Sequence, residues 1–515
     1  MASILTNTSA MVALQNLRTI NSDLVSTQNE IATGKSVATA KDNSAIWAVS
    51  KVIESDVNSF QAISDSLNLG DATISVGREA AETVTELLTE LKGNIVAAQE
   101  ENVDRSKIQA DIDTQIDQIQ SIVAAASFNG LSLVEGTEDV TILGSLQRDS
   151  SGVVTASEIS IARGDLTTNA GTYNSSGTQL ANDGGTLNTV LSGTTIADTG
   201  VTAEITFNVA TGTDDYDGDV AVVSVGGVDI EFTGGAGDNA TEAAAFFEGQ
   251  INALGLEGVT ASAATGVLTI TSTNAFSTVD VAVSGLTGDA AGTEITGLNG
   301  ATGLSATTGT IEQRAESITF SATAAVNDGD GYQASFGGDV FRYIAGPGEN
   351  FEDVARGLKA AIDAGNQAGI TTNVSQDPTT NQWVLSIDNS GSSSVTLAVD
   401  GRAGGEASGG LFGLEGIDVT TNESAAAALA NIDTFINTSI DAAASFGSDQ
   451  SRIDLQSGFI TKLTDSLKAG IGSLVDADLE ATSARLQALQ VQQQLGIQSL
   501  SIANQAPQSI LSLFR

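Results

Sequence analysis

The chain has 515 residues, a length that corresponds to about three or four domains. Its 63 Asp and Glu outnumber its 20 Lys and Arg, and the net charge of −43 argues against binding to nucleic acid or to anionic membranes. The absence of Cys and His excludes disulfides, thiolate metal sites, Ser-His-Asp triads and zinc proteases. No apolar run approaches the roughly 18 residues of a membrane-spanning helix. We therefore predict no enzyme activity, no cofactor and no membrane insertion.

The N-terminal stretch predicts a helix with one weak apolar stripe. Leu17, Leu24 and Ile31 are seven residues apart, and mostly Ser, Thr, Asn and Gln lie between them. Gly34 suits the left-handed turn that follows a helix, so we expect the helix to end there. The apolar positions of the stripe are Met11, Leu14, Leu17, Ile20, Leu24 and Ile31.

Residues 479–515 predict a second dilute heptad at the other end of the chain. Gln and Gly interrupt its apolar positions, which weakens a coiled coil but helps to fix its register. Pro507 predicts a break or kink before an apolar tip. The heptad positions are Leu479, Leu486, Gln493 and Leu500, and, three residues after each, Thr482, Leu489, Gly496 and Ala503; the tip contains Ile510, Leu511, Leu513 and Phe514.

Two such weak helices suggest that the ends of the chain pair with each other and with neighbouring copies. Alone, each buries too little surface to offset the entropy lost on ordering. An ordinary two-helix bundle within one domain is the alternative, although most of the chain separates the two helices.

Between the ends, helices flank a β-rich middle. Residues 36–58 begin as a linker and become helical around Asp42 or Ser44. Residues 58–99 read as a long helix and residues 105–126 as its antiparallel partner. Residues 140–161 predict a β-hairpin, and helical spacing returns near Ser424. From there we expect a long amphipathic helix with an apolar face of Leu429, Ile432, Phe435, Ile436, Ile440, Ile453, Leu455, Phe459, Leu463 and Leu467. The helical ends must close on each other, because each has an apolar face to bury.

The middle contains a weak internal repeat. Residues 220–273 and 332–388 each read as a hairpin around Gly-Gly, a short amphipathic helix and a second hairpin, a ββαββ unit. The alternative is chance similarity between turn-rich sequences.

We therefore predict an α+β fold, in which both chain ends form terminal coiled-coil helices and an antiparallel helical bundle, with β-rich domains inserted between them. The expected segments are 1–42, an N-terminal coiled-coil helix; 43–165, a helical hairpin plus β-hairpin; 166–300 and 301–420, two variable β-rich domains; 421–474, a long C-terminal helix; and 475–515, a C-terminal coiled-coil helix.

Several acidic motifs are weak evidence for a metal site or a catalytic site. Residues 215–219 alternate carboxylates as a calcium loop does, and residues 328–331 echo them, but no bidentate Glu follows in register. Acidic turns between strands explain both stretches without a metal. Carboxylate pairs are too common in this chain to single out a catalytic acid and base.

Three stretches resemble bacterial flagellin. Residues 20–45, INSDLVSTQNEIATGKSVATAKDNSA, resemble its N-terminal signature, and Ser127–Gly130 is similar to its Gln-Phe-Asn-Gly motif. Ala503–Gln508 and Leu511–Arg515 resemble its C-terminal signature. The distant blocks match in the right order and near both termini, which makes the resemblance specific.

The resemblance covers residues 1–150 and 424–515 and implies a subunit of the helical flagellar filament used for swimming. It implies an inner tube of terminal coiled coils, an outer tube of longer helices and β domains on the surface, with residues 140–161 as a switch between packings. The implied partners are copies of the chain, the flagellar secretion apparatus, a C-terminal export chaperone, the filament cap and hook-junction proteins. The implied location is extracellular, reached without a cleaved signal peptide, and residues 1–11 show no such signal.

A hook–filament junction protein and a secreted adhesin acting through the central β domains are the alternatives. The expected assembly interface consists of Leu14, Leu17, Leu24, Ile31, Leu479, Leu486, Leu489, Leu500, Ala503, Leu511, Leu513 and Phe514.

Overall fold

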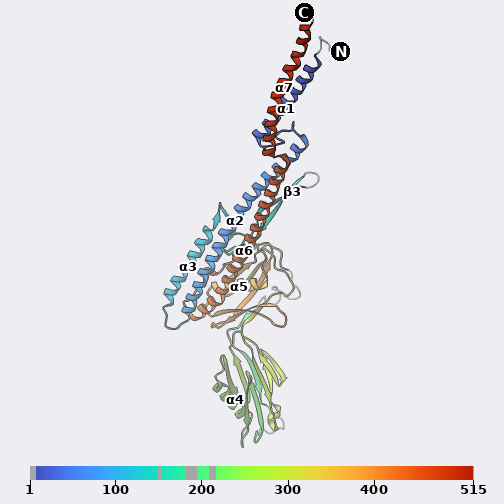
Figure 1. Ribbon diagram of the computed structural model, residues 1–515. Coiled ribbons are helices and arrows are strands. Elements are labelled where there is room, and N and C mark those ends of the chain that lie inside the picture. The colour runs from blue at the N-terminus through green and yellow to red at the C-terminus, as the bar shows by residue number, and fades with distance from the viewer. Residues whose placement is uncertain (1–6, 149–152, 181–193, 208–215, 514–515) are drawn as a thin grey trace. The chain divides into compact units, whose positions relative to one another are not determined.

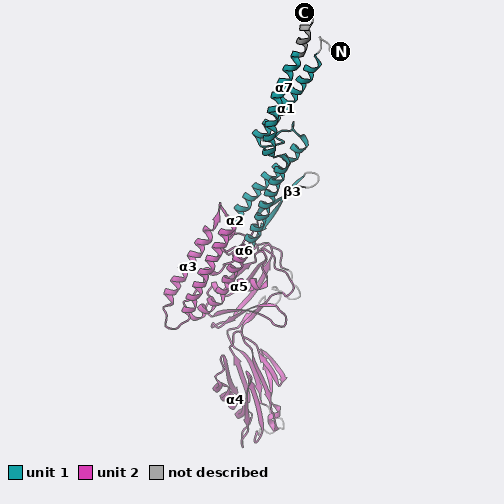
Figure 2. Ribbon diagram, viewed as in Figure 1, with its two compact units in different colours: residues 1–72, 141–161, 448–515 teal, residues 73–140, 162–447 magenta. Residues whose placement is uncertain are grey.

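A computed structural model describes residues 7–148, 153–180, 194–207 and 216–513, and Figure 1 shows its helices and strands. The chain divides into two compact units (Figure 2). Unit 1 contains Met1–Ala72, Thr141–Ile161 and Ser448–Arg515, and unit 2 contains Thr73–Val140 and Ala162–Gly447. Each unit combines segments from both halves of the chain, and the mixture of helix and sheet confirms the predicted α+β class.

Unit 1 is built around the two terminal helices, α1 (Thr8–Thr33) and α7 (Leu479–Leu513), which lie side by side (Figure 1). Asn7 begins α1 by accepting the Ala10 N–H at 3.0 Å. Gly34 ends the helix with a φ of 68°, the left-handed conformation that glycine adopts without strain. The position of Gly34 is the predicted one.

Backbone hydrogen bonds join the segment after α1 to the segment before α7 in unit 1. The Ser36 N–H donates to the Val475 carbonyl at 2.7 Å, and the Ala477 N–H donates to the Gly34 carbonyl at 3.0 Å. The start of the predicted linker is therefore anchored to the end of α6 (Asn422–Val475).

The sequence predicted a break or a kink at Pro507, and of these the break is wrong, because α7 continues as helix to Leu513. A proline in a helix removes one backbone hydrogen bond, and in α7 this loss does not end the helix.

The hairpin of β3 (Val140–Arg148) and β4 (Val154–Ile161) packs on long helices in unit 1. Its predicted turn falls largely on residues 149–152, outside the described residues. Gln456 of α6 donates to the Gly144 carbonyl at 3.0 Å. Ile142 lies against Gly70 of α2 (Ser44–Ala98), where no side chain keeps the strand away.

Unit 2 begins with the other end of α2 and its antiparallel partner α3 (Arg105–Ala125). Asn94 of α2 donates to Gln115 of α3 at 3.0 Å. The pair ends in a small hairpin of β1 (Ser127–Phe128) and β2 (Leu131–Ser132). The buried apolar residues of these two helices include Val84, Leu88, Leu91 and Ile95 of α2 and Ile112, Ile116, Ile119 and Val123 of α3.

The predicted apolar face of α6 is only partly buried. Ile432, Phe435 and Ile453 are buried, whereas Leu455 is 77% exposed and Phe459 is also exposed. A helix turns by about 100° per residue, so the step of two residues from Ile453 to Leu455 places them on nearly opposite faces. The expectation that Leu455 and Phe459 belong to one buried stripe is therefore wrong.

The first β module (β6 to β14) packs two sheets around one core. Strand order is β13-β12-β6-β10-β9 in one sheet and β14-β11-β7-β8 in the other. The elements are β6 (Val201–Thr206), β7 (Val220–Val225), β8 (Val228–Thr233), α4 (Ala240–Leu254), β9 (Val259–Ala264), β10 (Val267–Ser272), β11 (Val279–Ser284), the 3-10 helix η1 (Gly288–Gly292), β12 (Glu294–Leu298), β13 (Ala301–Ala306) and β14 (Thr308–Ile311). The expected domain boundary between residues 300 and 301 falls inside this module, since β13 pairs with β12 and β14 with β11.

The second β module (β5 and β15 to β20) repeats the arrangement with sheets β15-β19-β18 and β17-β16-β20-β5. Its elements are β5 (Thr194–Ile196), β15 (Glu316–Thr319), β16 (Gly331–Phe336), β17 (Asp339–Ile344), α5 (Phe351–Ala364), β18 (Ile370–Gln376), β19 (Trp383–Asn389) and β20 (Val395–Arg402), followed by the 3-10 helix η2 (Leu414–Gly416). Because β5 precedes the first module and pairs with β20, the first module is an insertion within the second.

The two predicted copies have the same order of elements. In both, the first hairpin turns at Gly-Gly with two positive φ values, 58° and 82° at residues 226 and 227 and 64° and 97° at residues 337 and 338. In both, an Asn with a full capping box begins the helix, Asn239 for α4 and Asn350 for α5. The helix then joins hairpins that belong to opposite sheets.

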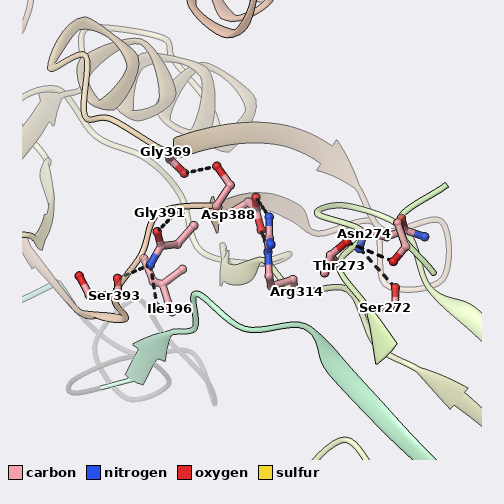
Figure 3. Close-up of polar contacts among 12 residues, drawn as sticks. Ile196, Ser272, Thr273, Asn274, Arg314, Gly369, Asp388, Gly391 and Ser393 are labelled. Atoms are coloured by element: carbon pink, nitrogen blue, oxygen red, sulfur yellow. Dashed lines mark hydrogen bonds and ion pairs between the residues drawn. The ribbon is translucent and has the colours of Figure 1, made fainter. Parts of the chain in front are cut away.

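An ion pair links the segment that follows the first β module to a strand of the second (Figure 3). Arg314 lies just after β14, and its guanidinium donates to both carboxylate oxygens of Asp388 on β19 at 2.8 and 2.7 Å. The backbone N–H groups of Arg314 and Ala315 donate to the carbonyls of Asn274 and Ala275 at 2.9 and 3.1 Å. The connecting segment between β14 and β15 is therefore bonded to both modules.

Candidate assembly interface

The seam between α1 and α7 is the feature that the heptads predicted. Gly496 of α7 faces Leu17 and Ile20 of α1, and a Cβ at Gly496 would lie 3.2 Å from the Leu17 Cδ1. Asn7 donates through its side chain to the Ala503 carbonyl at 2.8 Å. Because residues near the start of α1 contact residues near the end of α7, the two helices are antiparallel. Glycine at this position lets the helices approach closely.

Polar groups mark the register of the seam. Gln493 donates to Asn21 at 2.7 Å, so the Gln in the heptad has a partner on the opposite helix. Thr27 and Thr482 are buried, and their hydroxyls donate to the carbonyls four residues earlier in the chain at 2.8 and 2.7 Å. Polar heptad positions of this kind favour one register at some cost in stability.

The predicted interface residues divide into three groups. Leu489 is buried, and Leu17, Leu24, Ile31, Leu486, Leu500 and Ala503 are half-buried. Leu14 and Leu479 are instead 40% and 51% exposed. Leu511 and Leu513 lie in α7, but their side chains fall outside the described part, as does Phe514 entirely.

A second apolar face was missed by the sequence analysis. Leu495 and Ile502 are seven residues apart on α7 and 56% and 68% exposed, and Val491 extends their row. On α1, Met11 and Val25 are exposed, two heptads apart. The spacing of α7 already contained this signal, because Ala488, Leu495 and Ile502 form a second heptad row beside the first.

A groove of about 620 Å³ runs along the paired helices near their ends. Val12, Ala13 and Ile20 line it from α1, and Leu495 and Gly496 line it from α7. The exposed side chains of Val12 and Leu495 stand on opposite helices at this groove.

The two terminal helices are nearly free of charge. Residues 1–33 contain one Arg, one Asp and one Glu, and residues 479–515 contain two Arg and one Glu, so their charges sum to zero. All of the net charge of −43 therefore lies in residues 34–478. Copies of the chain can bring these ends together without mutual repulsion.

Comparison with known proteins places these features in a family. The sequence model of the bacterial flagellin N-terminal helical region matches residues 4–139, and that of the bacterial flagellin C-terminal helical region matches residues 429–514. Flagellin A of Rhizobium meliloti is 30% identical over 524 residues, covering 100% of both chains. The chain belongs to the bacterial flagellin family. It is accordingly a structural protein, a subunit of the flagellar filament.

Other relatives agree in part. Flagellin B of Rhizobium meliloti is 30% identical over 522 residues, again over 100% of both chains. Flagellin FljK of Caulobacter vibrioides is 42% identical over 171 residues, which is 32% of this flagellin chain and 62% of FljK. A crystal structure of Xanthomonas campestris FlgL covers 82% of this chain at 10% identity with a TM-score of 0.28, too low to bear on function.

The described part of the chain has neither a membrane-spanning helix nor a cluster of metal ligands. No helix there has the length and apolarity to cross a membrane. In the same part of the chain, no three or more His, Cys, Asp or Glu are placed to hold a metal ion. The first acidic stretch, residues 215–219, begins with Asp215, which lies outside the described residues.

Proposed function

We propose that the paired ends of this flagellin are its polymerisation interface, and that the outward apolar row of α7 joins one copy to the next. The observation that carries the proposal is the two-sided character of α7. One face packs on α1, while Leu495 and Ile502 remain exposed on another. Apolar rows on surface helices of a soluble chain mark contacts with other proteins.

Folding and assembly are coupled in this proposal. The seam within one chain contains Gln, Gly and Thr, so α1 and α7 bury little apolar surface by themselves. A neighbouring copy supplies the missing apolar surface and thereby stabilises both helices. Contacts between unlike surfaces that do not close on themselves give a helical filament.

The predicted residues take different roles in this scheme. Leu17, Leu24 and Leu489 hold α1 and α7 together within one chain. Leu14 and Leu479, which are exposed, contact neighbouring copies instead. We assign the same intermolecular role to Leu511, Leu513 and Phe514 on the basis of their sequence alone.

The test compares two aspartate substitutions at adjacent positions of α7. Leu495→Asp places a charge in the outward apolar row, and Gln494→Asp places the same charge on an exposed position beside it. Purified monomers are seeded with filament fragments and examined by electron microscopy. We expect Leu495→Asp to stop elongation and Gln494→Asp to allow it.

Circular dichroism of both monomers provides the control for folding. Leu495 is exposed in one chain, so its replacement should leave the helix content and the melting temperature close to those of the parent. Normal filament growth by the Leu495→Asp protein would refute the proposal.

The individual flagellar partners that the family resemblance implied are part of the same proposal. An export chaperone would cover the exposed apolar row of α7 until assembly, and the secretion apparatus, the filament cap and the hook-junction proteins would receive the ends at their respective steps. Export without a cleaved signal peptide is proposed in the same way. Of the alternatives, the junction protein is disfavoured by the full-length similarity to flagellins, and no observation favours the adhesin.

A further inference from the structure

The sequence contains two Asn-Gly pairs, Asn129-Gly130 and Asn299-Gly300. Each forms the two-residue turn of a β-hairpin, between β1 and β2 and between β12 and β13. Their backbones match closely, with φ values of 51° and 82° in the first pair and 52° and 80° in the second. The two turns therefore form a natural comparison in which the dipeptide and its backbone φ angles are nearly the same.

An Asn-Gly pair is chemically labile because glycine has no side chain to shield its backbone nitrogen. The Gly nitrogen can attack the Asn Cγ, forming a C–N bond and releasing the side-chain nitrogen as ammonia. Water then adds to either carbonyl of the cyclic imide and opens it to aspartate or isoaspartate. The reaction consumes one water, releases one ammonia and needs no oxidant or reductant.

The side chain of Asn299 is held on both of its polar atoms. Its amide donates to the Thr310 carbonyl at 2.9 Å, and its carbonyl oxygen accepts the Glu312 N–H at 3.0 Å. Both bonds must break before the Cγ can turn toward the Gly300 nitrogen. Two such bonds reduce the reactive fraction by roughly tenfold or more.

Asn129 has no such restraint. Its side chain is exposed and makes no hydrogen bond within the described part of the chain. The hairpin that holds it consists of only two residue pairs, Ser127 with Ser132 and Phe128 with Leu131, and forms a sheet of its own. In contrast, β12 pairs on both sides within a five-stranded sheet. A short isolated hairpin opens more easily than a strand inside a sheet.

We propose that Asn129 is a site of spontaneous deamidation, with water as the co-reactant, and that hydrogen bonding protects Asn299 from the same reaction. The product places either a new carboxylate or an isoaspartate, which lengthens the main chain by one methylene, in the turn that follows α3. Both products alter a stretch that lies within the matched flagellin N-terminal region.

The experiment ages the full-length chain in mildly alkaline buffer at 37 °C and follows both sites by mass spectrometry. Cleavage after Glu at slightly acidic pH places them on separate peptides, residues 102–135 and residues 295–312. We expect the first peptide to gain the mass change of amide-to-acid conversion at least about tenfold faster than the second, as two hydrogen bonds imply. An Asn129→Gly variant should remove the fast conversion from the first peptide and thereby assign it.

The same ageing in concentrated urea is the control. Unfolding removes the hydrogen bonds of Asn299, so the two rates should become similar. Equal rates in the folded protein, faster conversion of Asn299, or no conversion of Asn129 in the folded protein would each overturn the proposal.

Discussion

At the scale of single residues, two ion pairs of this chain differ in burial: Arg314–Asp388 is buried, and Lys51–Glu54 lies at the surface. The side chains of Arg314 and Asp388 are 10% and 3% exposed, and their two hydrogen bonds compensate for the loss of water around both charges. Lys51 and Glu54 form an ion pair on α2 whose side chains are half exposed, and such a pair contributes little.

We predict that Arg314→Ala destabilises the β modules by about 3 to 5 kcal/mol, because it leaves Asp388 charged and buried without a partner. The comparison variant Lys51→Ala should cost about 1 kcal/mol or less. Unfolding in denaturant can be followed through Trp383 fluorescence in a Trp47→Phe background. A loss with Arg314→Ala no larger than that with Lys51→Ala would contradict the prediction.

Glu349 illustrates how burial changes a carboxyl group in the second module. Burial raises its pKa from 4.5 to about 7, and nearby Asp353 and Asp328 add to the effect, although a hydrogen bond from Tyr343 opposes it. The Tyr343 O–H lies 2.8 and 2.9 Å from the two carboxyl oxygens. The folded protein therefore holds a proton on Glu349 at pH values where the unfolded chain has released it.

We predict that this group lowers the stability of the second module as the pH rises from about 4.5 to about 7. Below this window both states are protonated and above it both are ionised, so the stability contribution changes only within it. The full change is about 3 kcal/mol. Glu349→Gln should abolish this slope in pH-dependent unfolding, and Glu257→Gln, at an exposed position, should preserve it. An unchanged slope in Glu349→Gln would show that another group titrates.

At the scale of elements, the two ββαββ units show how local sequence rules repeat. Asn239 and Asn350 each accept a backbone N–H from the first turn of the following helix, at 2.8 and 2.7 Å. The carboxylates of Glu242 and Asp353 in turn accept hydrogen bonds from the backbone N–H of the capping Asn at 3.2 and 2.8 Å. The same device begins both helices although their apolar residues differ.

We predict that Asn239→Ala and Asn350→Ala each cost about 1 kcal/mol, since each leaves a backbone N–H at the helix start without its partner. Asn→Ser at either position should recover most of the loss. Hydrogen exchange of the first turns of α4 and α5 measures the effect directly. Equal protection in the Ala and Ser variants would argue that the caps contribute nothing.

At the scale of the whole molecule, the net charge and the exposed apolar rows lie in different parts of the chain. The terminal helices carry no net charge and expose apolar rows, while residues 34–478 carry all of the −43. Such a distribution suits a chain whose ends pack against copies of themselves and whose middle resists nonspecific association.

We predict that a chain trimmed to residues 35–478 stays folded in its β modules but no longer forms filaments. The trimmed chain lacks α1 and α7, so it has neither the seam nor the outward apolar row. Light scattering and electron microscopy after seeding measure the loss, and Trp383 fluorescence checks the second module. Micrometre-long threads of the trimmed protein would contradict the assembly proposal.

The sequence by itself determined the local elements and the pairing of the ends. The heptads containing Leu17 and Leu489 indicated the seam, Gly34 indicated the end of α1, and the Gly-Gly turns indicated the repeated hairpins. These signals are legible because they depend on neighbours close in sequence: helix period, capping and the backbone freedom of glycine.

Only the tertiary structure decided how distant segments combine. It placed β5 in the second module, making the first module an insertion, and it extended the first module beyond residue 300 to Ile311. It also exposed Leu455 and Phe459, which the sequence analysis had expected to be buried, and paired Arg314 with Asp388. Strand pairing and burial depend on contacts between segments that are far apart in the sequence. The spacing of apolar residues shows that a helix or strand has an apolar face, but it does not identify the segment that covers this face.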